Sequence, residues 1–190
     1  PGFNALKFFE LAVSEKITWY SGVPTMHQAI LLRGKRQAET AKVLNLRFIR
    51  SSSASLPPAV FDELAALFVC PVIEAYGMTE ATHQMTSNPL PPLIQKAGFV
   101  GLPAGPEVCI MDITGNQLEI GAEGEVCIKG DNVTPGYEKN PEANAQSFTN
   151  GWFRSGDHGL FDNDGYFKIT GRLKEIINRG GEKISPLEID

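Results

Sequence analysis

Short apolar runs alternate with helix-like segments over the first half of the chain. The expected strands cover residues 17–20, 46–49 and 72–75, and the expected helices cover residues 3–12, 24–32 and 57–68. This alternation is typical of βαβ units, whose strands form a parallel sheet covered by helices. In such sheets ligands bind beyond the carboxyl ends of the strands. The loops at 51–55 and 76–80 follow expected strands, so they are the predicted ligand-binding loops.

The patterning changes at the proline-rich segment 88–92. Beyond it, short alternating runs at 107–111, 125–128 and 166–169 replace the helical pattern, and glycine-containing turns separate them. We therefore expect a small, mostly antiparallel β subdomain with one helix near 141–148. The predicted divisions are an α/β subdomain at 1–90, a β-barrel-like subdomain at 91–171 and a further segment at 172–190.

Charge, hydrophobicity and cysteine content argue against three classes of protein: nucleic-acid-binding proteins, proteins with a membrane-spanning helix and zinc-binding proteins. The net charge of −5 argues against a nucleic-acid-binding protein, which needs a basic face. No apolar run approaches the roughly 18 residues that a membrane-spanning helix requires. Cys70, Cys109 and Cys127 are widely spaced and form no CxxC pair. They favour buried free thiols in a reducing intracellular compartment, such as the cytoplasm or peroxisome, over a zinc site.

The segment Tyr76-Gly77-Met78-Thr79-Glu80 gathers the groups that a nucleotide site needs. An aromatic ring can stack on a purine, and Gly77 allows a close approach of the main chain. A threonine hydroxyl can bond a phosphate oxygen, and Glu80 is an oxygen ligand of the kind that Mg²⁺ takes. The alternative for these five residues alone is a strand, a glycine turn and a helix capped by Thr79.

Three other positions carry groups for the same chemistry. Asp157 can accept hydrogen bonds from both hydroxyls of a ribose, although it is equally compatible with closing a turn. Arg172 follows an expected strand and either contacts the nucleotide or lies on the surface. His83 lies three residues past Glu80, where an imidazole can pair with an anionic substrate or lie on a helix surface. The loop at 179–183 lacks the spacing of a Walker phosphate loop, so a tight hairpin competes with a ligand-contacting loop there.

Taken together, these motifs resemble the adenylate-forming superfamily of acyl-CoA synthetases, luciferases and peptide-synthetase adenylation domains. The similarity runs over essentially the whole chain and preserves the order of the motifs. Residues 76–80 match the adenine, phosphate and magnesium motif, and Asp157 matches the ribose-binding aspartate. Residues 124–130 with 135–137 match the β-subdomain signature. Residues 171–174 match the hinge that precedes a small C-terminal domain.

The resemblance implies a fold and an activity. The chain is expected to be α/β and to be part of the large N-terminal domain of an AMP-forming acyl-CoA ligase. Such an enzyme joins a carboxylate to AMP, releases pyrophosphate and passes the acyl group to coenzyme A. ATP, AMP, Mg²⁺, coenzyme A and a small-molecule carboxylate are the implied ligands.

Individual residues acquire roles through the same resemblance. Thr79 and Glu80 are the implied catalytic residues, with Glu80 also the metal ligand. The hinge residue is Lys174, where many relatives carry aspartate, and the coenzyme A loop contains Gly180 and Gly181. The implied nucleotide-binding residues are Ser53, Ala54, Glu74, Ala75, Tyr76, Gly77, Met78, Thr79, Asp157 and Arg172.

The segments 19–28 and 81–85 are most similar to the oxalyl-CoA synthetases, also called peroxisomal-type CoA synthetases. Oxalate carries a second carboxylate, for which Ser53 and His83 are the predicted polar partners. An amino-acid adenylation module and a catalytically dead AMP-binding protein are the alternatives. Met78 argues mildly against the first, because such modules more often have proline there.

The chain begins Pro1-Gly2-Phe3 without an initiator methionine or a signal-peptide pattern, so we expect an internal piece of a longer protein. The resemblance places a Ser/Thr/Gly-rich phosphate loop upstream and a catalytic lysine beyond Asp190. We therefore expect the isolated piece to have little or no adenylation activity.

Overall fold

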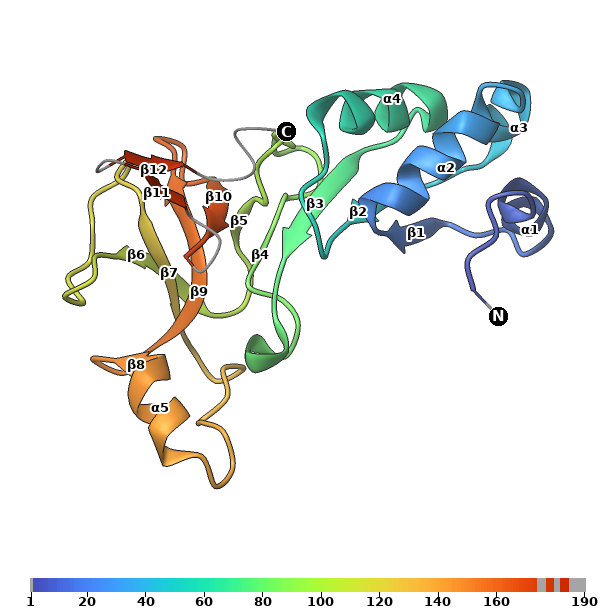
Figure 1. Cartoon of the computed structure of the whole chain (residues 1–190). Coiled ribbons are helices and arrows are strands. Elements are labelled where there is room, and N and C mark those ends of the chain that lie inside the picture. Colours follow the sequence, from blue (N-terminus) through green and yellow to red (C-terminus); the bar gives the residue numbers. More distant parts are fainter. Residues whose placement is uncertain (1, 174–176, 180–181, 185–190) are drawn as a thin grey trace. The chain divides into compact units, whose positions relative to one another are not determined.

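A computed structural model describes residues 2–173, 177–179 and 182–184 of the chain (Figure 1). The chain forms two compact units, Pro1–Ala75 with Asn88–Gly101 and Tyr76–Ser87 with Leu102–Asp190. The predicted nucleotide motif at 76–80 thus belongs to the second unit. The predicted ranges 1–90, 91–171 and 172–190 differ from these units, and they stay a prediction about the domains of the full-length protein.

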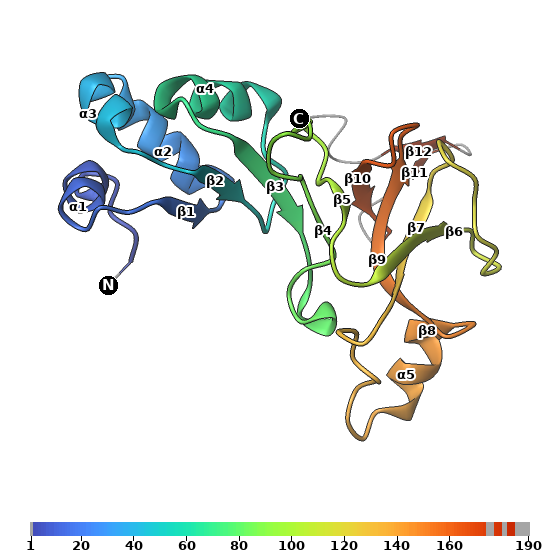
Figure 2. The ribbon, with the colours of Figure 1, turned by 180° about the vertical axis from the view of Figure 1, so that it is seen from behind.

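The first unit contains a parallel sheet with helices packed on it. Strand β1 (Trp19–Gly22) pairs with β2 (Phe48–Ser51), and β2 pairs with β3 (Val72–Tyr76), in parallel register. Figures 1 and 2 show α2, α3 and α4 on the same side of these strands. The helices are α1 (Phe8–Ser14), α2 (Pro24–Gly34), α3 (Ala38–Val43) and α4 (Pro58–Phe68). The predicted α/β fold class is confirmed.

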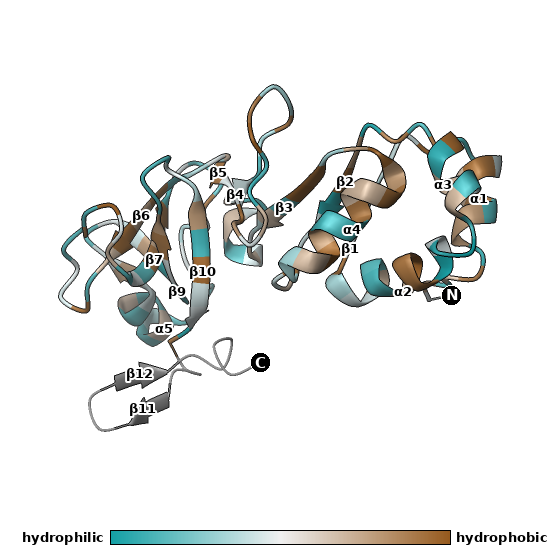
Figure 3. Cartoon of the chain, turned by 90° about the horizontal axis from the view of Figure 1, so that it is seen from above, coloured by the Kyte–Doolittle hydropathy of each residue, from teal (hydrophilic) through white to brown (hydrophobic). Residues whose placement is uncertain are grey.

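Helix α4 shows why these residues form a helix. Pro58 occupies the first turn, where its missing N–H breaks no hydrogen bond. Phe61, Leu64 and Phe68 recur at helical spacing and are buried. Phe68 also stacks on Phe9 of α1, with ring centroids 6.0 Å apart. Each such side chain contributes about 1.5–3 kcal/mol by leaving water. Hydrophobic and hydrophilic positions both occur along this helix in Figure 3, as expected for one buried face.

The first helix is shorter than the sequence predicts. It begins at Phe8 instead of Phe3, and Phe3 and Leu6 are 45% and 59% exposed. The Asn4 side chain accepts a hydrogen bond from the Leu6 N–H at 2.9 Å. That local bond gives the backbone an alternative to the helical hydrogen bond, because asparagine favours turns over helix interiors. The short helix α3 was not expected at all.

The second unit is built on an antiparallel sheet, as predicted. Its strands are ordered β10-β9-β7-β6, and β8 also pairs with β9. These strands are β6 (Glu107–Met111), β7 (Gly124–Lys129), β8 (Phe148–Thr149), β9 (Trp152–Phe161) and β10 (Phe167–Arg172). Helix α5 (Pro141–Ser147) lies near the predicted 141–148, and the Asn140 side chain caps it by accepting from the Ala143 N–H at 3.1 Å.

Two further antiparallel pairs complete the second unit. They are β4 (Thr86–Ser87) with β5 (Leu102–Pro103), and β11 (Ile177–Arg179) with β12 (Glu182–Ile184). The predicted positions Lys174, Gly180 and Gly181 lie outside the described residues.

Strand β9 excludes the alternative that Asp157 closes a turn. Asp157 lies inside this ten-residue strand and not at its end. Gly156 and Gly159 interrupt the apolar alternation, so the sequence does not show the strand. Gly159 is required by packing, because a Cβ there would lie 2.4 Å from the Lys168 carbonyl oxygen of β10. Strand β10 likewise extends to Arg172, so that Arg172 is part of the strand and does not follow it.

All three cysteines are free thiols, as expected. Cys70 and Cys127 are buried, whereas Cys109 is only half-buried, which corrects the expectation for that residue. Burial raises the pKa of Cys70 to about 11 and that of Cys127 to about 12, with a further contribution from Glu125 to Cys127.

Candidate functional site

Tyr76 and Asp157, which are 81 residues apart, are in direct contact. The Tyr76 hydroxyl donates a hydrogen bond to Oδ2 of Asp157 at 2.5 Å. Nε of Arg172 lies 3.1 Å from Oδ1 of the same carboxylate. Asp157 and Arg172 also face each other in the register of β9 and β10. The fold therefore brings together three of the predicted nucleotide-binding residues, all from the second unit.

The Tyr76 ring is more enclosed than its predicted stacking role suggests. Tyr76 is the last residue of β3, not the first residue of a loop, and only 8% of it is exposed. Its ring packs against Phe167, with centroids 5.8 Å apart. Burial raises the pKa of the Tyr76 phenol, and the neighbouring Asp157 charge raises it further. The hydroxyl is thus held in its protonated, donating form, and purine stacking stays a prediction.

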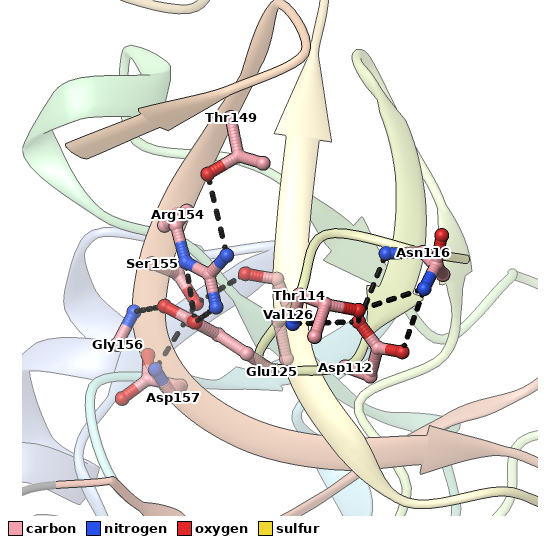
Figure 4. A network of polar contacts seen from close by, with 10 residues as sticks. All are labelled: Asp112, Thr114, Asn116, Glu125, Val126, Thr149, Arg154, Ser155, Gly156 and Asp157. Atoms are coloured by element: carbon pink, nitrogen blue, oxygen red, sulfur yellow. Dashed lines mark hydrogen bonds and ion pairs between the residues drawn. The ribbon is translucent and has the colours of Figure 1, made fainter. Parts of the chain in front are cut away.

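A partly buried polar network positions the backbone around Asp157 (Figure 4). Arg154 forms an ion pair with Glu125 of β7 and donates from Nε to Oε2 at 2.7 Å. The other oxygen of Glu125 accepts from the Gly156 N–H at 3.0 Å. Ser155 donates its hydroxyl to the Val126 carbonyl oxygen and accepts from the Asp157 N–H. Glu125, Arg154 and Ser155 support the site without being predicted nucleotide-binding residues, and no local sequence signal marks them as partners.

The turn that follows Tyr76 is compact. A Cβ on Gly77 would lie 1.3 Å from the His83 carbonyl oxygen, so only glycine fits there. The sequence predicts that the Gly77 main chain lies close to a ligand. In the structure the group that lies close to Gly77 is the main-chain carbonyl of His83. Thr79 and Glu80 form a single 3₁₀ turn, Thr79–Ala81, and Thr79 and His83 are exposed. His83 has a positive φ of 83°, which places it after the turn and not on a helix surface.

Glu80 contacts a second loop. Its Oε1 accepts a hydrogen bond from the Tyr137 hydroxyl at 2.9 Å, and its main-chain carbonyl accepts from the Thr134 N–H at 2.7 Å. Within the part of the chain that the structure describes, no group of three or more His, Cys, Asp or Glu side chains is arranged to hold a metal ion. A cation at Glu80 would thus have few protein ligands.

Met78 is the N-cap of the 3₁₀ turn in the second unit, and the other predicted residues not yet placed belong to the first unit. Ser53 and Ala54 are exposed in the loop after β2, and Ser53 has a positive φ of 72°. Glu74 and Ala75 are buried in β3. Glu74 accepts from the Gly98 N–H at 2.9 Å and from the Leu56 N–H at 3.4 Å. It therefore ties the end of the Ser51–Leu56 loop to the sheet.

Glu74 gives the fold a pH dependence. Burial raises its pKa from 4.5 to about 7, although the Gly98 and Leu56 N–H groups partly oppose the shift. Between pH 4.5 and about 7 the folded protein binds more protons at Glu74 than the unfolded chain does. The free energy of unfolding should consequently fall as the pH rises through this window, by about 3 kcal/mol from this residue, and stay level above it.

The measurement is a series of denaturant titrations of the full-length protein from pH 4.5 to 8, with Glu74→Gln as the matched variant. We expect the variant to lose the downward slope because it has no proton to release. An identical slope in both proteins would show that Glu74 is ionised with an ordinary pKa.

Comparisons with known proteins identify relatives of this chain. The family described as AMP-binding enzyme matches residues 1–138. The chain is 53% identical to an oxalate–CoA ligase of Arabidopsis thaliana over 189 residues, which are 99% of this chain and 37% of the relative. It is 49% identical to an oxalate–CoA ligase of Saccharomyces cerevisiae, over 100% of this chain and 34% of the relative.

Solved structures show the same fold. ATP-bound MatB from Rhodopseudomonas palustris superposes with a TM-score of 0.90 at 34% identity, over 100% of this chain and 37% of that protein. The O-succinylbenzoate coenzyme A synthetase of Bacillus subtilis, in complex with ATP and magnesium, gives 0.85 at 30% identity, over 98% of this chain and 38% of that protein.

The fold and the matched residues are those of the adenylate-forming superfamily, and the chain belongs to the AMP-binding enzyme family. Among its relatives it is similar to oxalate–CoA ligases, as the segments 19–28 and 81–85 suggest. It spans little more than a third of the length of these relatives. No helix in the described residues is long and apolar enough to cross a membrane.

Proposed function

We propose that the full-length protein is an AMP-forming acid–thiol ligase that activates oxalate with ATP and transfers the oxalyl group to coenzyme A. The contact among Tyr76, Asp157 and Arg172 is the observation that carries this proposal. It places a carboxylate, a hydroxyl that donates to it, a guanidinium that forms an ion pair with it and the 76–80 motif in one unit. Support comes from the family match and from relatives named as oxalate–CoA ligases.

Asp157 is the proposed partner of the ribose hydroxyls. Its Oδ2 already accepts a hydrogen bond from Tyr76, and its Oδ1 forms an ion pair with Arg172. A carboxylate offers about four lone-pair positions, so both oxygens retain capacity for a diol. Only 7% of Asp157 is exposed, and the two existing bonds fix its orientation before the nucleotide arrives. Because the Asp157 side chain is already oriented, less side-chain entropy is lost when the nucleotide binds.

Thr79 and Glu80 are the proposed phosphate and magnesium residues. Mg²⁺ typically takes one or two protein carboxylates and completes its coordination with water and substrate phosphates. Glu80 with the exposed Thr79 hydroxyl fits that pattern, since both are oxygen donors in one turn. When bound, Mg²⁺ supplies charge stabilisation on the phosphates. The protein residues hold the reacting groups in position, which is the main contribution to catalysis expected here.

The substrate carboxylate attacks the α-phosphate, and pyrophosphate leaves. The resulting mixed anhydride has AMP as a good leaving group, which the thiol of coenzyme A then displaces. The polar residues Ser53 and His83 are the proposed partners of the second carboxylate of oxalate, since an acyl chain would favour apolar residues. The same proposal includes Lys174 as the hinge residue and a coenzyme A loop that contains Gly180 and Gly181. It also includes the division into three parts at 1–90, 91–171 and 172–190, and a cytoplasmic or peroxisomal location.

The test is ATP–pyrophosphate exchange and coenzyme A-dependent AMP release by the full-length protein, with oxalate and octanoate as alternative substrates. We expect kcat/KM for oxalate to exceed that for octanoate by at least about 100-fold, because polar groups that bind a second carboxylate would be left unpaired by an acyl chain. Preference for octanoate would refute the oxalate assignment.

The same assay separates the alternatives. Exchange stimulated by an amino acid, without transfer to coenzyme A, would identify an adenylation module. ATP binding without any exchange would identify a nucleotide-binding protein that has lost catalysis. The isolated 190-residue piece is proposed to be inactive, and robust exchange by it would contradict that part of the proposal.

A further inference from the structure

The loop at residues 132–137 is bonded to the turn that carries Glu80. Asn132 donates from Nδ2 to the carbonyl oxygens of Ala81 and Gln84, at 2.9 and 3.3 Å. The Thr82 hydroxyl donates to the Asn132 carbonyl oxygen at 2.7 Å. Each of these bonds runs from a side chain of one loop to a main-chain carbonyl of the other. They fix where the turn lies, but none of them involves the Glu80 side chain.

Two other bonds act on Glu80 itself. The Thr134 N–H donates to its main-chain carbonyl at 2.7 Å, which fixes the backbone. The Tyr137 hydroxyl donates to Oε1 at 2.9 Å, which fixes the carboxylate. Glutamate has three rotatable side-chain bonds, and ordering such a side chain on ligand binding has an entropy cost. The bond from Tyr137 restricts rotation of the Glu80 side chain, and it uses Oε1, so Oε2 can still bind a ligand.

Tyr137 is itself held from the other side. Its N–H donates to Oδ1 of Asn144 in α5 at 2.7 Å, and Nδ2 of Asn144 donates to its carbonyl oxygen at 3.0 Å. Its ring lies 6.4 Å from that of Phe153, measured between centroids. Gly136 has a φ of 142° that other residues rarely adopt, and it sets the direction of the chain entering Tyr137. These contacts hold Tyr137 in place, and its hydroxyl is therefore directed at Glu80.

We propose that Tyr137 is a positioning residue that orients the Glu80 carboxylate for the magnesium ion of the bound nucleotide. The inference rests on the proposed function, since it assumes that Glu80 meets Mg²⁺–ATP. Metal-binding carboxylates are typically oriented by such hydrogen-bonding neighbours.

A purely structural role is the competing explanation, because Tyr137 also belongs to the joint between the two loops. Thr82→Val provides the matched control. It removes a hydroxyl from the same joint and leaves both bonds to Glu80 in place. Tyr137→Phe removes only the hydroxyl that reaches Glu80 and keeps the ring beside Phe153.

The experiment measures ATP affinity of the full-length protein by titration calorimetry, with saturating Mg²⁺ and with EDTA. Tyr137→Phe is expected to weaken ATP binding about tenfold with Mg²⁺ and to leave it unchanged in EDTA, the size that loss of a neighbour of a metal ligand typically has. Thr82→Val should bind as the unsubstituted protein does under both conditions. In a Glu80→Gln background, Tyr137→Phe should have no further effect on the Mg²⁺-dependent part.

Three results would overturn the proposal. They are equal loss in Mg²⁺ and EDTA, equal loss in Thr82→Val, and a full tenfold loss from Tyr137→Phe in the Glu80→Gln background. Failure of the unsubstituted protein to bind ATP at all would instead remove the proposed function on which this inference rests. The two failures are therefore distinguishable.

Discussion

Gly77→Ala is expected to lower the stability of the folded protein more than any other single substitution in the turn that follows Tyr76. The added Cβ would lie 1.3 Å from the His83 carbonyl oxygen and 2.4 Å from its carbon, whereas such a contact normally needs about 3.3 Å. Backbone atoms cannot rotate away as a side chain does, so residues 77–84 must move together. We expect the free energy of unfolding to fall by at least about 3 kcal/mol. Nucleotide binding should be lost with it, because Thr79 and Glu80 are in the same segment.

Denaturant titration and AMP binding of the full-length protein measure both effects. Gly151→Ala is the control, since its Cβ would meet nothing within 4 Å and only its positive φ of 80° is unfavourable. It should cost about 1 kcal/mol and leave AMP binding intact. A Gly77→Ala protein as stable as the control would mean that the main chains of Gly77 and His83 do not approach each other.

Arg154→Leu is the second substitution with a large expected effect. The side chains of Arg154 and Glu125 are only 16% and 7% exposed, so removing one partner leaves an unpaired charge that water cannot solvate. Breaking such a pair costs about 3–5 kcal/mol. Glu125 also accepts from the Gly156 N–H, next to Asp157. We therefore expect the affinity for ATP to fall together with stability.

A double-mutant cycle checks the physical cause. Arg154→Leu combined with Glu125→Leu removes both charges and should be less destabilised than the sum of the single variants by about 2 kcal/mol or more. The Gly156 N–H is left without its partner in the double variant, so complete recovery is not expected. Additive effects would mean that the two charges do not interact in the folded protein.

The sequence allowed the type of most elements to be predicted and placed the main motifs on them. Apolar periodicity predicted α2, α4 and the parallel strands, because one buried face leaves a regular pattern. It failed at β9, whose glycines at 156 and 159 interrupt the alternation, and of these two Gly159 is required by the neighbouring strand β10. It also failed at the start of α1, where Asn4 forms a local bond that competes with the helix.

The sequence likewise predicted some features of the candidate site and missed others. Local chemistry predicted Asp157, Arg172 and Tyr76 as nucleotide-binding residues, and the structure brings these three side chains into contact. It gave no sign that the Tyr76 hydroxyl, as opposed to its ring, makes the contact with Asp157. The roles of Tyr137, Glu125 and Arg154 as supports were also missed, since each acts on a residue at least 29 positions away.

By itself the sequence determined the fold class, the family and the order of the motifs, because these depend on periodicity and on residue types at short spacing. Only the tertiary structure decided which hydroxyl meets which carboxylate, and why Gly77 and Gly159 must be glycine. Those facts depend on distances between segments that are far apart along the chain. Strand register and the packing of loops set these distances, and no local pattern records them.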